Sequence, residues 1–372
     1  MNAAGIILSG IYSDGLDPVT KHRTVASLPF GGRYRQIDFT LSNMVNSGIV
    51  SIGVITKYNY QSLIDHLGSC QDWDLNRRRG GVKIIPPYAS GDTGGYRGKT
   101  EELRAALPYL KTLRADWVVI ADTGTICNIA LRPVVEKHAA GGKDITIVAS
   151  HVLCDEQTVS ELVFDAEGDV PGSIYLNYAA RKGQYSSDGI YVLSRELLIE
   201  KIEQFASRGY YHFERDLLQQ GFNTGAISVG LYPFDGKVLK NRSVPEYLRN
   251  SLALTDRSIK DGLFNPERPI YTAVRDEVPS RYGDGCFVAE CTVADGCVVN
   301  GTVARSVLGR GVTIEEGASV AGSVIMDSCV IRSGAHVENA ILDRNVEVCG
   351  GCVIQGSPDA PAIVGKGIKV EK

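Results

Sequence analysis

Apolar residues recur at every sixth position over much of the C-terminal quarter of the chain. Turn residues such as Asp295-Gly296 and Ser333-Gly334 lie between them. The recurring residues form four runs of three: Phe287, Val293 and Val299; Leu308, Ile314 and Val320; Ile325, Ile331 and Val337; Leu342, Val348 and Ile354. A six-residue period is too long for a sheet pleat and too regular for a helix, but it fits one side of a triangular, left-handed parallel β-helix. We therefore predict about four coils of about eighteen residues each over residues 283–372.

The cysteines indicate a packing role rather than a chemical one. The chain has nine, and their spacing matches no pair of CxxC metal-binding motifs. Six of them fall within the predicted β-helix, at Cys286, Cys291, Cys297, Cys329, Cys349 and Cys352. We interpret these six as small, inward-facing side chains of a reduced, cytosolic protein.

Upstream of about residue 230, short β-rich runs alternate with helical stretches. The predicted buried strands are 4–8, 51–56, 117–121, 145–149 and 189–193, and the predicted helices are 39–48, 60–67, 100–113 and 132–140. Such alternation indicates an α/β fold with an open, mostly parallel, Rossmann-like sheet that binds ligands beyond the carboxyl ends of its strands. That topology places the loop 9–20 and the segment after residue 121 on one rim. The resulting organisation is an α/β domain at 1–234, a proline-containing connector at 235–282 and the β-helix at 283–372.

The first predicted strand leads directly into a loop, Ser9 to Thr20, where α/β proteins wrap backbone N–H groups around a nucleotide phosphate. A phosphate loop needs glycine for close backbone approach, and a fixed cation helps to neutralise the anion. Here Gly10 leads the turn, Ile11, Tyr12 and Ser13 follow it, and no Lys or Arg occurs in the loop. The loop therefore indicates a nucleotide-sugar enzyme fold that has lost much of its catalytic equipment.

Charge and hydropathy exclude several classes of partner. The formal net charge of -4 favours neither nucleic acid nor an anionic membrane surface. No apolar run approaches the roughly eighteen residues that a membrane-spanning helix needs. The N-terminal residues Met1 to Gly5 lack the basic segment of a secretory signal, so we expect a cytoplasmic location.

Several longer, ungapped runs resemble one enzyme family. Residues 28–43, LPFGGRYRQIDFTLSN, followed by 46–49 and 52–56, resemble the glucose-1-phosphate adenylyltransferase (ADP-glucose pyrophosphorylase) family. Tyr96-Arg97-Gly98 resembles the start of the family's WYxGTADA segment, residues 187–191 resemble its SMGIY segment, and residues 212–217 its HDFGxDL segment. The resemblance extends over nearly the whole chain. It implies an N-terminal nucleotidyltransferase domain joined to a C-terminal left-handed β-helix.

The departures from that family fall largely on its charged positions. Gly15 stands where the family has the arginine of LAGGxGTRLxPLT, and Val25 where it has the lysine of RAKPAVPFGG. Asp122 matches the first acid of GDHIYxMDY, whereas Asn128 replaces the second. The FEKP motif expected to hold the sugar phosphate has no counterpart between residues 164 and 186, and residues 240–243 lack the second metal-binding acid of WxDVGT. With one acid left, Mg²⁺ would be held weakly if at all, because it prefers carboxylates together with substrate oxygens.

The resemblance implies a vestigial nucleotide- or sugar-binding set rather than a catalytic one. The set comprises Gly10, Arg97, Gly98, Asp122, Asp188 and Gly189; Asp122 is its only retained family acid, and we expect no metal ligands and no tightly bound cofactor. Asp122 has an alternative role as the cap of the turn after its strand. Lys99 opens a predicted helix and could reach a phosphate, but we expect it to be an ordinary surface lysine.

Arg33 and Arg35 match a basic position that belongs, in the family, to an allosteric anion site. The resemblance therefore implies that these two arginines bind an anionic effector, either a sugar phosphate or a nucleotide. The alternative is that both are solvated surface arginines without a ligand.

These features together predict a regulatory, catalytically degenerate subunit, similar to the type D subunit that some bacteria pair with a catalytic glucose-1-phosphate adenylyltransferase subunit in a heterotetramer. It would support the conversion of ATP and glucose 1-phosphate to ADP-glucose and pyrophosphate in glycogen biosynthesis, with Mg²⁺ required by the catalytic partner. One alternative is an active pyrophosphorylase with rearranged phosphate and metal contacts. Another is a β-helix acyltransferase using His336; the adenylyltransferase-like N-terminal motifs disfavour it, and we expect His336 in a turn.

Overall fold

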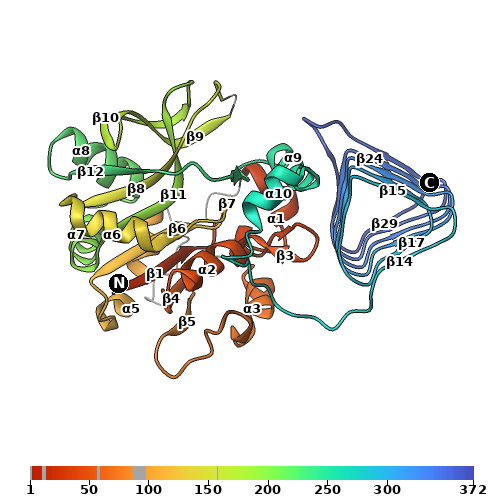
Figure 1. The fold of residues 1–372 in the computed structure, drawn as a ribbon, viewed down its shortest axis with the longest axis horizontal. Coiled ribbons are helices and arrows are strands. Elements are labelled where there is room, and N and C mark those ends of the chain that lie inside the picture. The colour runs from red at the N-terminus through yellow and green to blue at the C-terminus, as the bar shows by residue number, and fades with distance from the viewer. Residues whose placement is uncertain (1, 11–13, 57–58, 87–97, 157) are drawn as a thin grey trace.

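The computed structural model describes residues 2–10, 14–56, 59–86, 98–156 and 158–372. A nine-stranded sheet forms the centre of the N-terminal part (Figure 1). Its strands are β1 (Ala3–Leu8), β4 (Ser51–Ile55), β5 (Gly81–Ile85), β6 (Trp117–Asp122), β8 (Ile145–His151), β9 (Val159–Glu167), β10 (Val170–Ala179), β11 (Tyr185–Ser194) and β12 (Val229–Pro233). Strands β5, β4, β1 and β6 run parallel, as do β8 and β12, whereas β11 is antiparallel to both β6 and β8. The prediction of a mostly parallel sheet is confirmed.

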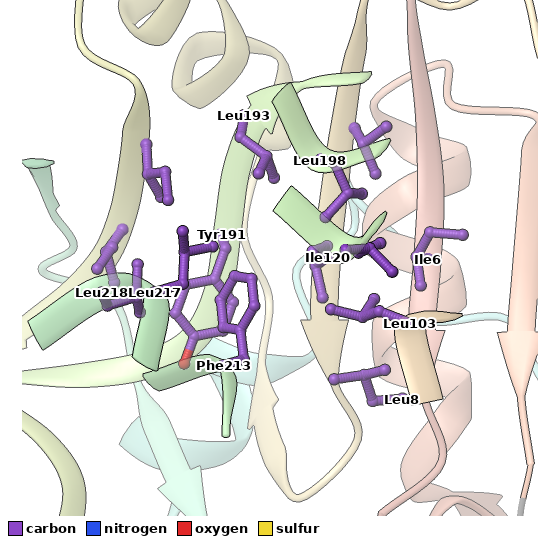
Figure 2. Packing of buried hydrophobic residues seen from close by; sticks show 14 of the residues in the cluster. Ile6, Leu8, Leu103, Ile120, Tyr191, Leu193, Leu198, Phe213, Leu217 and Leu218 are labelled. Atoms are coloured by element: carbon purple, nitrogen blue, oxygen red, sulfur yellow. The ribbon is translucent and has the colours of Figure 1, made fainter. Parts of the chain in front are cut away.

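Alternate residues of the central strands face opposite layers of helices. Ile6 and Leu8 of β1 pack toward α4 (Lys99–Ala105), α5 (Leu107–Thr112) and α7 (Arg195–Arg208). Ile7 packs on the other face, toward α2 (Gln36–Asn46), α3 (Gln61–Leu67) and α6 (Leu131–Gly141). Figure 2 shows the first of these layers, with Leu103 beside Ile6 and Leu8. Both faces are therefore covered, as the near-continuous apolar runs of the strands require.

Two parts of this domain differ from the prediction. The single helix expected at 100–113 is two helices, α4 and α5, that meet at Ala106. Pro108, near the start of α5, has no N–H to donate, and its ring disfavours a continuous helical turn before it. The sequence pattern also misses the antiparallel hairpin of β9 and β10. Many residues of β10 are half-buried or exposed, so their apolar alternation is weak.

Residues 235–282 pack against both neighbouring parts of the chain. Strand β13 (Val238–Lys240) pairs with β7 (Thr125–Cys127), and the helices α9 (Val244–Leu252) and α10 (Arg257–Leu263) follow it. One apolar cluster joins Tyr247 and Leu248 of α9 to Phe39 of the N-terminal part and to Val324 and Ile341 of the β-helix. This segment therefore fastens the β-helix to the sheet domain through buried apolar contact.

The C-terminal part is a left-handed β-helix with three parallel sheets (Figure 1). The first sheet contains β14 (Arg281–Tyr282), β17 (Val298–Val299), β20 (Thr313–Ile314), β23 (Val330–Ile331), β26 (Glu347–Val348) and β29 (Lys369–Val370). The second contains β15 (Phe287–Ala289), β18 (Thr302–Ala304), β21 (Ser319–Ala321), β24 (His336–Glu338) and β27 (Val353–Gln355). The third contains β16 (Thr292–Val293), β19 (Val307–Leu308), β22 (Val324–Ile325), β25 (Ala340–Leu342) and β28 (Ala362–Val364).

The six-residue period identifies the inward positions of the β-helix except at its start. Val303 pairs with Val320, and Val320 with Val337, so these coils are 17 residues long. Val288, rather than Phe287, pairs with Val303, because the first coil is shorter by two residues. Phe287 is 57% exposed and lies outside the core, which corrects the predicted pattern at this position.

Cys297, Cys329 and Cys352 are buried in the apolar core of the β-helix, as predicted, whereas Cys286, Cys291 and Cys349 are half-buried and pack against it. All nine cysteines of the chain are free thiols. His336, expected in a turn, lies in strand β24, where its Nδ1 is 2.7 Å from the hydroxyl of Ser319.

Among the helices of the described residues, none is both long and apolar enough to cross a bilayer.

Candidate functional site

A cavity of about 510 Å³ opens at the carboxyl ends of β1 and β6. The two strands end together because Leu8 pairs with Asp122. Gly10, Asp122 and Gly189 of the predicted set line this cavity, which we call the cleft. The loop after β1 and the segment after β6 therefore share one rim, as predicted from the alternation of strands and helices.

Two glycines of the first loop, Gly10 and Gly15, lie close against other parts of the chain, in the loop where the resemblance implies a phosphate site. Gly10 has a φ of +86°, and a Cβ added there would lie 2.5 Å from the Cβ of Val25. A Cβ at Gly15 would lie 2.3 Å from the backbone oxygen of Arg242. Both glycines are thus required by close packing. Ile11, Tyr12 and Ser13 lie outside the described residues.

Lys99 is buried, which corrects the expectation of a surface lysine. Its side chain is 3% exposed, and its Nζ donates hydrogen bonds of 2.6 Å to Oε2 of Glu161 and to Oε1 of Glu214. These carboxylates come from β9 and from a π-helical stretch, Phe213–Gln219. The sequence analysis missed this cluster because its three members come from distant segments. No local spacing signals that they meet.

The charges in this cluster shift one another's proton affinity. Burial raises the pKa of Glu214 to about 7, the nearby Glu161 adds to this effect, and Lys99 opposes it. Burial alone would lower the pKa of Lys99, but Glu161 and Glu214 outweigh it and hold that pKa well above its usual value. Lys99 is therefore a charged ammonium in the wall of the cleft.

Asp122 faces the cleft at the end of β6 and also caps a turn. Its Oδ1 accepts a 2.8 Å hydrogen bond from the backbone N–H of Gly124, and its Oδ2 lies 4.0 Å from the Nζ of Lys99. Burial raises the pKa of Asp122, against the opposing effect of Lys99. Gly189, with a φ of +70°, approaches Asp122 closely, since a Cβ there would lie 3.2 Å from the Asp122 Cβ.

Asp188 lies behind the wall of the cleft. It is fully buried, accepts a 2.7 Å hydrogen bond from the Oγ of Ser150 and lies 3.2 Å from the Nζ of Lys240. Gly98 is the N-cap residue of α4 and directly precedes Lys99. Arg97, the remaining member of the predicted set, lies outside the described residues.

The residues of the cleft do not fit a divalent metal. Asp122, the acid that the resemblance assigns to Mg²⁺, has the Lys99 ammonium at 4.0 Å. Lys240 and Arg242 line the cleft in the segment where the family has its second metal-binding acid. Among the described residues, no group of three or more His, Cys, Asp or Glu side chains is arranged to hold a metal ion. Mg²⁺ prefers several hard oxygen ligands, and like charge repels it, so we derive no reaction step through a metal here.

Asn128, which replaces the family's second acid at that motif, is a structural residue. Its amide donates hydrogen bonds of 2.8 Å to the backbone oxygens of Leu263 and Arg268, and its side-chain oxygen accepts one of 3.0 Å from Arg268. It does not line the cleft. Asn128 thus ties the segment after α10 to the sheet domain.

Arg33 and Arg35 are separated by the fold. Arg33 is exposed, with its guanidinium 5.5 Å from the ring centre of Tyr34. Arg35 is 5% exposed and lines a second cavity of about 180 Å³, which we call the basic pocket. The other Arg and Lys side chains that line the basic pocket are Arg23, Arg275, Arg344 and Lys366, and the imidazoles of His22 and His66 line it too. The pocket lies between the sheet domain and the β-helix, because Arg344 and Lys366 come from the β-helix.

The basic pocket has an excess of positive charge, but three of its arginines have carboxylate partners: Arg23 pairs with Asp343, and Arg275 and Arg344 pair with Asp327. Asp65 also lines the pocket. Burial lowers the pKa of Arg35 to about 10, and the nearby Arg344 adds to the decrease. Among the described residues, no carboxylate lies within ion-pair distance of Arg35, whose Nη1 instead donates to the backbone oxygen of Ser27. The sequence analysis missed Arg23, Arg275, Arg344 and Lys366, of which the last three lie far from Arg35 in the chain.

A strand-led α/β domain with a rim cleft, joined to a hexapeptide β-helix, defines a protein of the sugar nucleotidyltransferase class. In agreement, residues 4–159 match the nucleotidyl transferase family and residues 278–364 the GlmU-like, C-terminal hexapeptide family. The chain is 35% identical to the glycogen biosynthesis protein GlgD of Geobacillus stearothermophilus over 317 residues, 85% of this chain and 82% of the relative. It is 29% identical to GlgD of Bacillus subtilis, covering 98% and 96% of the two chains.

Glucose-1-phosphate adenylyltransferases match over a similar length. The glucose-1-phosphate adenylyltransferase of Bacillus thuringiensis is 29% identical over 362 residues, 96% of each chain. The chain therefore belongs to the family formed by GlgD proteins and glucose-1-phosphate adenylyltransferases. The resemblance drawn from the sequence motifs is confirmed.

Proposed function

We propose that this chain is a regulatory, catalytically degenerate subunit of glucose-1-phosphate adenylyltransferase in glycogen biosynthesis. It would act in the cytoplasm through a catalytic partner subunit, in a heterotetramer, and the partner would bind the Mg²⁺ and form ADP-glucose and pyrophosphate from ATP and glucose 1-phosphate. The names of the relatives, GlgD and glucose-1-phosphate adenylyltransferase, support the pathway. The degenerate role rests on the charge pairing in the cleft.

Four Lys or Arg side chains line the described part of the cleft, and each is already paired with a carboxylate of the chain itself. Lys99 binds Glu161 and Glu214, Lys240 pairs with Asp188, Arg242 with Glu246, and Arg215 with Asp216. Nucleotidyl transfer brings two polyanions together and depends on fixed positive charge that is free to stabilise the phosphates. A triphosphate entering this cleft would compete with these carboxylates, which opposes binding and catalysis.

The test is to assay the chain alone and with its catalytic partner. Alone, with Mg-ATP and glucose 1-phosphate, the chain should form no ADP-glucose above the background without protein. Mixed with the catalytic subunit, it should elute as a complex on a sizing column and raise the affinity or turnover of that subunit. ADP-glucose synthesis by the isolated chain that Asp122→Asn abolishes would support instead an active pyrophosphorylase with rearranged contacts. Failure to form any complex would refute the regulatory role.

We further propose that the basic pocket, through Arg35, binds the anionic effector, a sugar phosphate or a nucleotide. The burial of Arg35, the crowding of like charges around it and the cavity of about 180 Å³ support this proposal. Arg33 is not part of the proposed site, since it does not line the pocket. An anion would relieve the repulsion between the arginines and accept charge-assisted hydrogen bonds from them.

Calorimetry with inorganic phosphate and with a nucleoside monophosphate tests the effector proposal. Arg344→Ala should weaken binding by about tenfold or more, as expected for the loss of a hydrogen bond between charged groups. Arg33→Ala is the matched control, because Arg33 is exposed and lies outside the pocket, and it should leave binding unchanged. Equal loss in both variants would place the anion elsewhere.

A further inference from the structure

The ammonium of Lys99 lies where three segments of the chain converge. Helix α4 supplies Lys99, strand β9 supplies Glu161, and the π-helical stretch before α8 (Gln220–Asn223) supplies Glu214. Both hydrogen bonds are 2.6 Å long, and the Lys99 side chain is 3% exposed. Glu214 is 8% exposed and Glu161 41%, so the ammonium and one of its two carboxylates are largely removed from water. Short contacts between charged groups of this kind form a well-ordered cation site.

The third carboxylate near this ammonium is Asp122, with its Oδ2 at 4.0 Å. Asp122 is also the acid that faces the cleft and the one that the family resemblance assigns to the metal. A divalent cation bound to Asp122 would therefore lie within a few ångströms of a fixed positive charge. The carboxylates that could otherwise add to its coordination, Glu161 and Glu214, are already bound to Lys99.

We propose that Lys99 is a resident substitute for the divalent metal of the cleft. Its ammonium offsets part of the negative charge of Glu161, Glu214 and Asp122 and occupies the position between them, without a metal ion. The inference concerns the same cleft as the proposed function, but it does not require a partner subunit. Metal binding by the chain alone therefore tests this inference, whereas complex formation and activity test the regulatory role.

Mn²⁺ is the probe, because its paramagnetic resonance signal measures the free ion directly. The full-length wild-type chain should leave the Mn²⁺ signal unchanged, because the Lys99 ammonium already occupies the position that a metal ion would take. In Lys99→Ala, Glu161, Glu214 and Asp122 lose their common counter-ion, so Mn²⁺ affinity should rise by about tenfold or more when the like charge is removed. Adding Asp122→Asn to this variant should reduce the gained affinity.

Two controls test whether the effect belongs to Lys99. Lys99→Arg retains the positive charge and should not gain Mn²⁺ binding. Lys240→Ala also removes a cleft lysine, but its ion pair is with the single carboxylate of Asp188, so no set of carboxylates is released and no gain is expected. Thermal melting establishes which variants are folded.

Two results would overturn the proposal. One is Mn²⁺ binding by the wild-type chain that Asp122→Asn removes, and this measurement needs no Lys99 variant. The other is a folded Lys99→Ala chain with no more Mn²⁺ affinity than the wild type. If Lys99→Ala does not fold, Lys99→Ala combined with Glu214→Gln, which leaves less uncompensated negative charge, replaces it in the same titration. A smaller gain over the wild type is then expected, because Glu161 and Asp122 remain as the released carboxylates.

Discussion

Among single residues, Glu214 makes the stability of this chain depend on pH. Its pKa is raised from 4.5 to about 7, by burial first and then by Glu161, while Lys99 opposes the change. Between about pH 4.5 and 7 the folded chain keeps a proton that the unfolded chain releases, so the free energy of unfolding falls as pH rises through this window. We expect Glu214→Gln to remove this component of the pH dependence.

Urea denaturation at pH 5 and pH 8 measures this effect. The difference in the free energy of unfolding between the two pH values should be smaller in Glu214→Gln than in the wild type. Glu196→Gln, at a side chain that is 89% exposed, should keep the wild-type difference. Identical pH dependence in all three proteins would contradict the burial of a titrating Glu214.

A second prediction concerns the turn at Gly10. Ala at a positive φ costs roughly 1–2 kcal/mol, and overpacking against Val25 should add about 1–3 kcal/mol to Gly10→Ala. Gly142→Ala is the matched control, because Gly142 also has a positive φ, of +61°, but nothing lies within 4 Å of an added Cβ. Chemical denaturation should show the larger loss for Gly10→Ala, and Val25→Ala should recover part of it. Equal losses at the two glycines would exclude the close contact with Val25.

At the scale of elements, the coils of the β-helix depend on their inward residues. Ile331 of β23 is 0% exposed, so Ile331→Ala should cost about 2–5 kcal/mol in the free energy of unfolding. Ile368 is 50% exposed and is the matched control, for which Ala should cost much less. Because stacked coils contact mainly their neighbours, the loss should fall on the transition that unfolds the β-helix. Denaturation monitored by circular dichroism checks this prediction, and similar costs at the two isoleucines would contradict the inward position of Ile331.

Elements also show where local pattern is sufficient. The strands at 51–56 and 117–121 are long apolar runs, and the structure contains them as β4 and β6. The half-exposed hairpin of β9 and β10 has no such run, and it supplies Glu161 to the cleft. The sequence pattern therefore does not identify a site residue on such a weakly patterned strand, and only the pairing of the strands in the structure shows that it reaches the cleft.

At the scale of the whole molecule, one buried ion pair joins the two domains. Arg23 of the sheet domain binds Asp343 of the β-helix, with side-chain exposures of 3% and 6%. Arg23→Ala would leave Asp343 buried without its counter-ion, so we expect a loss of about 3–5 kcal/mol. Scanning calorimetry should then show separate transitions for the two domains. Arg257→Ala removes an exposed pair with Asp261 and should change the profile little, whereas an unchanged Arg23→Ala profile would exclude this role of the pair.

The amino-acid sequence alone determined the β-helix, the alternating α/β domain, the family and the loss of charge at Gly15 and Val25. These are local properties, because a period of six, an apolar run or a missing side chain is visible within a few residues. Only the tertiary structure decided that Lys99 is buried, that Arg35 and not Arg33 faces the basic pocket, and that Arg23 meets Asp343. Those contacts join residues 62, 115 and 320 positions apart in the cases of Lys99 with Glu161, Lys99 with Glu214 and Arg23 with Asp343. Which charge meets which carboxylate depends on the order of strands and the docking of domains, and no local pattern encodes either.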